Sequence, residues 1–175
     1  MKRIVCSIAV LMLVMALFST TALAEIKPIQ LSIWETVQLY DKSTSISGLR
    51  LSIYGVNEDV KGIDFGLVTK VNGEFLGWQS GIVNLVEGNA TGYQDGVFNR
   101  VRGDFLGWQT GWVNITESKF TGLQTGLVNM VGDMHGVQFS VVNVADTLYG
   151  LQIGIINLNN SGNPFKFLPL VNFSF

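Results

Sequence analysis

The chain has 175 residues, of which 47% are hydrophobic and 14% are charged, and its formal net charge is −2. This length corresponds to a single domain. The balance of charges excludes a strongly basic surface that could neutralise nucleic-acid phosphates, so we expect no nucleic-acid partner.

The first 24 residues have the pattern of a secretory signal peptide. Lys2 and Arg3 form a positive start, residues 4–18 are apolar or small, and Ala22-Leu23-Ala24 fits a cleavage site. We therefore predict a signal peptide over residues 1–24 and one all-β repeat domain over residues 25–175. The only cysteine, Cys6, lies inside the signal peptide, so the mature protein has neither a disulfide nor thiol chemistry.

Residues 25–45 are the least regular part of the mature chain. Residues 28–34 alternate between apolar and polar side chains as a strand does, and residues 37–40 do so again. Residues 41–45 have the composition of a loop. We expect this segment to form an atypical first strand that covers one end of the domain.

From residue 46 onward the chain is built from a repeated unit, G-x-Q-x-G-x-V-N. Degenerate copies begin at Gly48, with Arg50 in the Gln position, and at Gly62, with Asp64 in that position. A last copy ends the chain over residues 169–172. A fixed period of 14 or 15 residues indicates a repeat architecture. The repeated polar positions, which we predict to be structural, are Gln79, Gln94, Gln109, Gln124, Gln138 and Gln152, with Asn84, Asn99, Asn114, Asn129, Asn143 and Asn157.

Each unit is an alternating apolar and polar run bounded by a short turn that is rich in Gly, Asn and Asp. Most acidic side chains of the mature chain lie in these turns. Such turns suit positive φ angles, and no window after the signal peptide has helical periodicity. The fold class is therefore predicted to be all-β.

The order of the strands is predicted from the symmetry of the unit about its Gln. Gly lies two residues away on both sides, and an apolar residue lies four residues away on both sides, as in Phe75 and Val83 around Gln79. A unit that reads alike in both directions keeps its faces matched in antiparallel pairs. We therefore predict an antiparallel meander closed into a small barrel or ring. The alternative is a β-solenoid with one 14–15-residue unit per coil.

The two faces of such strands differ. The face that reads apolar-Gly-Gln-Gly-apolar is predicted to point inward. The other face carries Trp, Leu, Ile and Thr, and is too apolar to lie bare in water, so we expect it to meet lipid, a partner or a second layer. Residues 171–175 resemble the final strand of bacterial outer-membrane barrels, whereas Asp95 would be unfavourable on a lipid face.

The chain resembles a family of bacterial surface-repeat proteins, known mainly from Gram-negative bacteria. The resemblance lies in the G-x-Q-x-G-x-V-N units, in Gly48-Leu49-Arg50-Leu51 followed by Tyr54-Gly55, and in residues 167–173. It implies an exported protein of the periplasm, outer membrane or cell surface and no established activity. Some members carry a polyhydroxyalkanoate-synthase label, and the resemblance implies a fold similar to the hairpin-built ring called a β-flower.

No residue is a credible catalytic group. A synthase of that kind needs a Cys nucleophile and a His base, but the mature chain has no Cys, and its only His, His135, occupies an outward strand position. The scattered carboxylates give no acid–base pair and no metal-ligand spacing, so we expect no cofactor and no metal. Trp78, Trp108 and Trp112 either cover the sheet or form an aromatic surface for sugars or lipid.

These patterns predict a non-enzymatic, exported cell-envelope protein with a structural role or an association with outer-membrane lipid or another envelope protein. The alternative is a soluble β-solenoid binding module or adhesin that presents flat Gly and Gln faces.

Overall fold

The computed structural model describes residues 26–175, so the predicted signal peptide lies outside the described residues. The described residues form a single sheet of nine strands and no helix, which confirms the all-β prediction. The strands are β1 (Ile26–Trp34), β2 (Val37–Gln38), β3 (Ser45–Asn57), β4 (Val60–Val71), β5 (Phe75–Val86), β6 (Ala90–Val101), β7 (Phe105–Phe139), β8 (Val142–Asn159) and β9 (Phe167–Ser174).

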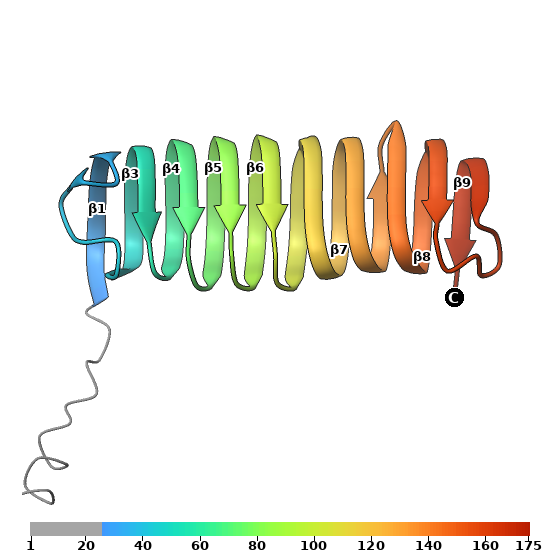
Figure 1. The fold of residues 1–175 in the computed structure, drawn as a ribbon, viewed down its shortest axis with the longest axis horizontal. Helices are drawn as coiled ribbons and strands as arrows, with labels where there is room; N and C mark the ends of the chain where they lie inside the picture. Colours follow the sequence, from blue (N-terminus) through green and yellow to red (C-terminus); the bar gives the residue numbers. More distant parts are fainter. Residues whose placement is uncertain (1–25) are drawn as a thin grey trace, which may run out of the picture.

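The chain winds into a β-solenoid of about nine turns, with one repeat unit in each coil (Figure 1). Strands β3 to β8 pair with their neighbours in parallel, and Gly62 pairs with Gly77 just as Gln79 pairs with Gln94. The predicted antiparallel meander and closed barrel are therefore wrong, and the solenoid alternative is confirmed. The molecule is a straight rod whose two ends lie far apart (Figure 1).

Parallel stacking follows from a difference between the two glycines of each unit. The first glycine has a positive φ in every coil, as in Gly107 at 136°. A Cβ there would lie 2.0 Å from the carbonyl oxygen of Gly92, the equivalent glycine one coil earlier. The second glycine, Gly111, has no positive φ, and the side chains of Asn99 and Asn114 occupy the space beside it. The backbone conformation of the unit is therefore not symmetric about its Gln, although its residue types are nearly so.

The chain turns a corner between the Gln and the Asn of each coil. Gln79 and Asn84 both point inward although they are five residues apart, and Ile82 and Val83 between them both point outward. An odd spacing of two inward residues cannot occur in a straight strand, where the faces alternate with period two. The ladder of paired residues also skips Ile82 and its equivalents. The position four residues after the Gln, which we predicted to be inside, therefore lies outside.

The interior is narrow and divided into an apolar half and a polar half. The apolar half consists of two rows that contribute one residue each per coil, represented by Phe75 and Val86. Within one row the rings of Phe105 and Phe120 stack in parallel with their centroids 5.0 Å apart. The polar half contains the Gln and Asn rows, every member of which is fully buried.

The two ends of the rod depart from the repeat. At the N-terminal end β1 continues the parallel stack, with Gln30 paired to Arg50, and the departure is β2, which folds back antiparallel on β1. Tyr40 packs against the apolar core and its carbonyl oxygen accepts a hydrogen bond from Gln30. At the C-terminal end β9 runs antiparallel to β8.

Candidate functional site

The buried Gln side chains form a continuous hydrogen-bonded ladder along the rod. In each step the Nε2 of one Gln donates to the Oε1 of the Gln one coil earlier, over 2.6 Å to 2.9 Å. All these amides therefore point the same way, with their N–H groups toward the N-terminal end. Aligned hydrogen bonds polarise one another, so the ladder is stronger than its separate bonds.

The Asn side chains form a second ladder that runs in the opposite sense. The Nδ2 of each Asn donates to the Oδ1 of the Asn one coil later, as in the 2.7 Å bond from Asn84 to Asn99. The same Nδ2 also donates to a backbone carbonyl, which for Asn84 is that of Asp95 at 2.7 Å. The Thr69 hydroxyl occupies the Asn position one coil earlier and donates to Asn84 at 2.8 Å. These amides are fully engaged inside the rod and are unavailable to a ligand.

An ion pair ends the Gln ladder at its N-terminal end. Arg50 and Asp64, which sit in Gln positions, are both fully buried, and two guanidinium nitrogens donate to the two carboxylate oxygens at 2.7 Å and 2.6 Å. Gln79 donates to the same carboxylate at 2.9 Å. The negative charge therefore receives the N–H end of the aligned amides, and Arg50 compensates it. The sequence marked both residues only as departures from the repeat.

His135 has no partner suited to catalysis in the described structure. It lies in an open groove of about 520 Å³ near the C-terminal end, lined by His135, Gly136, Val137, Tyr149, Gly150, Leu151 and Phe175. Its ring lies 5.5 Å from the ring of Tyr149. Only His135 and Tyr149 of this lining have titratable side chains, and the lining includes no Asp, Glu, Ser or Cys. Across residues 26–175, no three His, Cys, Asp or Glu side chains gather as metal ligands would.

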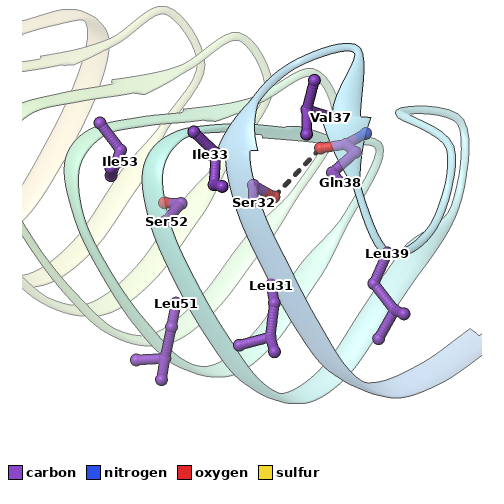
Figure 2. Close-up of a pocket in the computed structure, with 9 residues that line it drawn as sticks. All are labelled: Leu31, Ser32, Ile33, Val37, Gln38, Leu39, Leu51, Ser52 and Ile53. Atoms are coloured by element: carbon purple, nitrogen blue, oxygen red, sulfur yellow. Dashed lines mark hydrogen bonds between the residues drawn. The ribbon is translucent and has the colours of Figure 1, made fainter.

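A second open groove of about 490 Å³ lies at the N-terminal end (Figure 2). It is lined by Leu31, Ser32, Ile33, Val37, Gln38, Leu39, Leu51, Ser52 and Ile53. Its few polar groups are neutral, and Ser32 donates a hydrogen bond to Gln38 over 3.2 Å. Such a surface can hold an apolar group, but its lining has no acid, base or nucleophilic pair for a reaction.

An apolar row runs along the outer surface at the corner between the Gln and Asn positions, and we call it the apolar ridge. Each coil contributes one uncharged, large apolar residue, exposed by 41% to 64%, and Trp112 is the most exposed. Figure 2 shows the first two members, Ile33 and Ile53, side by side on neighbouring coils. The ridge consists of Ile33, Ile53, Leu67, Ile82, Val97, Trp112, Leu127, Val141 and Ile155.

The ridge was not predicted, because a single alternating strand has no corner and places every second residue outside. The available signal was the pair of successive apolar residues before each Asn, such as Ile82 and Val83. Two successive outward apolar residues break period two and mark a corner.

The charged turns lie about half a coil away from the ridge and form a charged edge along the rod. On this edge the Asp104 carboxylate accepts hydrogen bonds from the Ser118 hydroxyl at 2.6 Å and from the backbone N–H of Lys119 at 3.1 Å. These bonds stabilise the carboxylate and hold the pKa of Asp104 below its usual value. Charged members of the edge are Glu58, Asp59, Glu74, Glu87, Arg102, Asp104, Glu117, Lys119, Asp133 and Asp146.

No protein-family model, curated protein or solved structure matches the chain. The described residues also include no helix that is long and apolar enough to cross a bilayer.

Proposed function

We propose that this protein is a non-enzymatic, exported cell-envelope protein in which a rigid β-solenoid associates with outer-membrane lipid or another envelope protein through its apolar outer surface. The observation that carries the proposal is the apolar ridge, together with the apolar faces beside it. Soluble monomers rarely expose a contiguous apolar patch of this extent, and such patches mark membrane or protein contacts.

A structural role is supported by where the polar side chains of the repeat are used. Gln and Asn amides are bonded to one another inside the rod, and Arg50 and Asp64 are bonded to each other. The groove of about 490 Å³ has no titratable side chain in its lining, and the groove of about 520 Å³ has only His135 and Tyr149. These features suit a scaffold whose exterior makes the contacts.

The second candidate is a soluble solenoid binding module or adhesin. It is favoured by the rod itself, because stacked repeats create long, regular surfaces that bind extended partners. The candidates differ in what happens without a partner: a soluble module stays monomeric in water, whereas an envelope-associated rod sediments with membranes.

Cell fractionation tests the proposal. The full-length chain is expressed in a Gram-negative host, and the mature protein is followed through periplasmic extract, alkaline-washed membranes and detergent extract. We expect it in the washed membranes and, after removal of residues 1–24, in the cytoplasm. A monomeric mature protein in the periplasmic extract without detergent would refute the membrane or apolar-partner role and favour the soluble module.

A charge-matched pair of variants makes this experiment specific. Trp112→Asp places a negative charge on the apolar ridge, and Asn89→Asp places the same charge on the charged edge. Asn89 accepts a hydrogen bond from the backbone N–H of Asp104, and Asp59 already plays that part toward Glu74. The Asn89 variant should therefore fold and fractionate as the wild type does, whereas the Trp112 variant should move to the soluble fraction.

A further inference from the structure

The apolar ridge is narrow, continuous and straight, and these properties restrict what can cover it. Parallel strands are about 4.8 Å apart, so nine residues in successive coils form a row about 38 Å long, bordered by the partly exposed row to which Val83 belongs. The row lies on a convex corner of the coil. A protein partner would need a matching groove of that length, whereas acyl chains adapt to any convex apolar surface.

Most of the backbone at the ridge is already bonded within the rod, although the ladder of paired residues skips the ridge residue itself. Residues on both sides of each corner pair with the coils above and below, as Gly81 does with Gly96 and Val83 with Phe98. A segment can enter the apolar part of a bilayer only when its N–H and C=O groups are bonded within the protein. A corner of a parallel solenoid comes closer to this condition than an ordinary loop does.

Aromatic side chains flank the ridge on the side of the Gln row. Trp78, Tyr93 and Trp108 follow one another along three coils, with ring centroids 6.1 Å and 5.2 Å apart. They lie between the apolar ridge and the charged edge. Trp and Tyr gather at this level in membrane proteins, where an apolar ring meets the polar headgroups.

The charges indicate which lipids fit. The ridge is uncharged, and the charged edge has more acidic than basic members. Lys70 and Arg100, three residues after the ridge members Leu67 and Val97, are paired with Glu87 and Glu117, so no unpaired cation beside the ridge favours anionic headgroups. Asp95, two residues before the ridge member Val97, accepts a hydrogen bond from the Ser80 hydroxyl at 2.9 Å. This carboxylate limits how deeply the centre of the ridge can enter.

From these observations we infer that the apolar ridge is a membrane-interface element: the rod lies flat on a bilayer of neutral, zwitterionic lipids, with the ridge among the upper acyl chains, the aromatic row at the headgroups and the charged edge in water. This is the arrangement of an interfacial amphipathic helix, built from stacked coils. The inference rests on the proposed function and names lipid as the apolar partner.

Single-tryptophan fluorescence tests the orientation. One variant keeps Trp112 and a matched variant keeps Trp78, with the other tryptophans replaced by Phe in each. Both are expressed as full-length chains, purified from the envelope and mixed with phosphatidylcholine vesicles that carry brominated acyl chains at shallow or deep positions. We expect Trp112 emission to shift to the blue and to be quenched by shallow bromines, with Trp78 quenched less.

Flotation with the same vesicles measures the affinity. Trp112→Asp should reduce the vesicle partition coefficient at least about tenfold. A tenfold change corresponds to about 1.4 kcal/mol of binding free energy, and burying an aromatic side chain contributes more binding free energy than that. Asn89→Asp should bind as the wild type does. Replacing about a third of the phosphatidylcholine by phosphatidylglycerol should not increase binding. Circular dichroism of each variant checks that the fold is intact.

The outcomes separate this inference from the proposed function. If Trp78 is quenched more than Trp112, or if binding requires anionic lipid, the orientation is refuted while lipid association stands. If the vesicles do not bind but the protein stays in washed membranes with another protein, lipid as the partner is refuted and the envelope role stands. If the protein is a lipid-free dimer in which Trp112 is already shielded, a second copy covers the ridge and the inference is wrong.

Discussion

Replacing both members of the buried ion pair, Arg50 and Asp64, by Gln should leave the free energy of unfolding about as it is. Either replacement alone should strongly destabilise the protein. Arg50 and Asp64 are each fully buried, and their paired hydrogen bonds measure 2.7 Å and 2.6 Å. Arg50→Gln leaves a buried carboxylate without its cation, and Asp64→Gln leaves a buried guanidinium without its anion. Removing one partner of a buried pair costs about 3–5 kcal/mol.

The double variant Arg50→Gln/Asp64→Gln puts in these two coils the amides that the next six coils have. Gln79 can then donate to the amide oxygen introduced at position 64, much as Gln94 donates to Gln79 at 2.7 Å. Exchanging a buried ion pair for well-packed hydrophobic residues of similar volume is often neutral or stabilising by about 1–4 kcal/mol. The amides introduced here are polar but can bond within the ladder, and they give up the Arg50 bonds to Asn57 at 3.3 Å and to the Lys70 carbonyl at 2.9 Å. The free energy of unfolding of the double variant should therefore lie within about 1 kcal/mol of the wild type or above it.

Urea unfolding followed by circular dichroism measures all four proteins of this double-mutant cycle. We expect a coupling energy of about 5 kcal/mol or more between the two positions, well above the usual range for exposed pairs. The surface variant Asp95→Gln serves as a control, because its carboxylate is only partly buried and its loss should cost less than about 1 kcal/mol. Two outcomes would refute the conclusion that this ion pair ends the Gln ladder. Each single variant could lose less than about 1 kcal/mol of unfolding free energy, or the double variant could lose the sum of the two single losses.

Three further predictions concern the glycine row, the charged edge and the ridge. Gly107→Ala should lower the free energy of unfolding in urea by about 2–5 kcal/mol, because the new Cβ meets the Gly92 carbonyl at 2.0 Å and φ is 136°. Gly162→Ala, with φ 74° and open space around it, should lower it by only about 1–2 kcal/mol. Equal losses for the two variants would contradict the stacking argument. The pKa of Asp104 is lower in the folded state, so its carboxylate stabilises the fold above the ordinary pKa of 3.8, and this stabilisation is lost as the pH falls below 3.8. Asp104→Asn should therefore make the urea midpoint depend less on pH in that acidic range. An unchanged pH dependence would contradict this prediction. Asp95→Thr, which copies the Thr of the next two coils at that position, should increase binding to phosphatidylcholine vesicles in flotation, and weaker binding would argue against insertion next to Val97.

Several features of the fold were predictable because each depends on a single coil. The period, the turns and the burial of the Gln positions follow from side-chain type at fixed spacing, and the structure places Gln109 and its equivalents in the interior. The engagement of Arg50 with Asp64 was not predicted, because the two residues are 14 positions apart and meet only when consecutive coils stack in register.

By itself, the amino-acid sequence determined that the chain is a β repeat, with one Gln and one Asn in each regular unit and with most acidic side chains in the turns. Only the tertiary structure decided that the strands are parallel and that the chain turns a corner beside the ridge. The physical reason is that the direction of pairing depends on backbone conformation, and the two glycines of a unit differ in it. Both Gly107 and Gly111 lie against a carbonyl of the preceding coil, but only Gly107 has a positive φ, and Gly111 also makes room for Asn side chains.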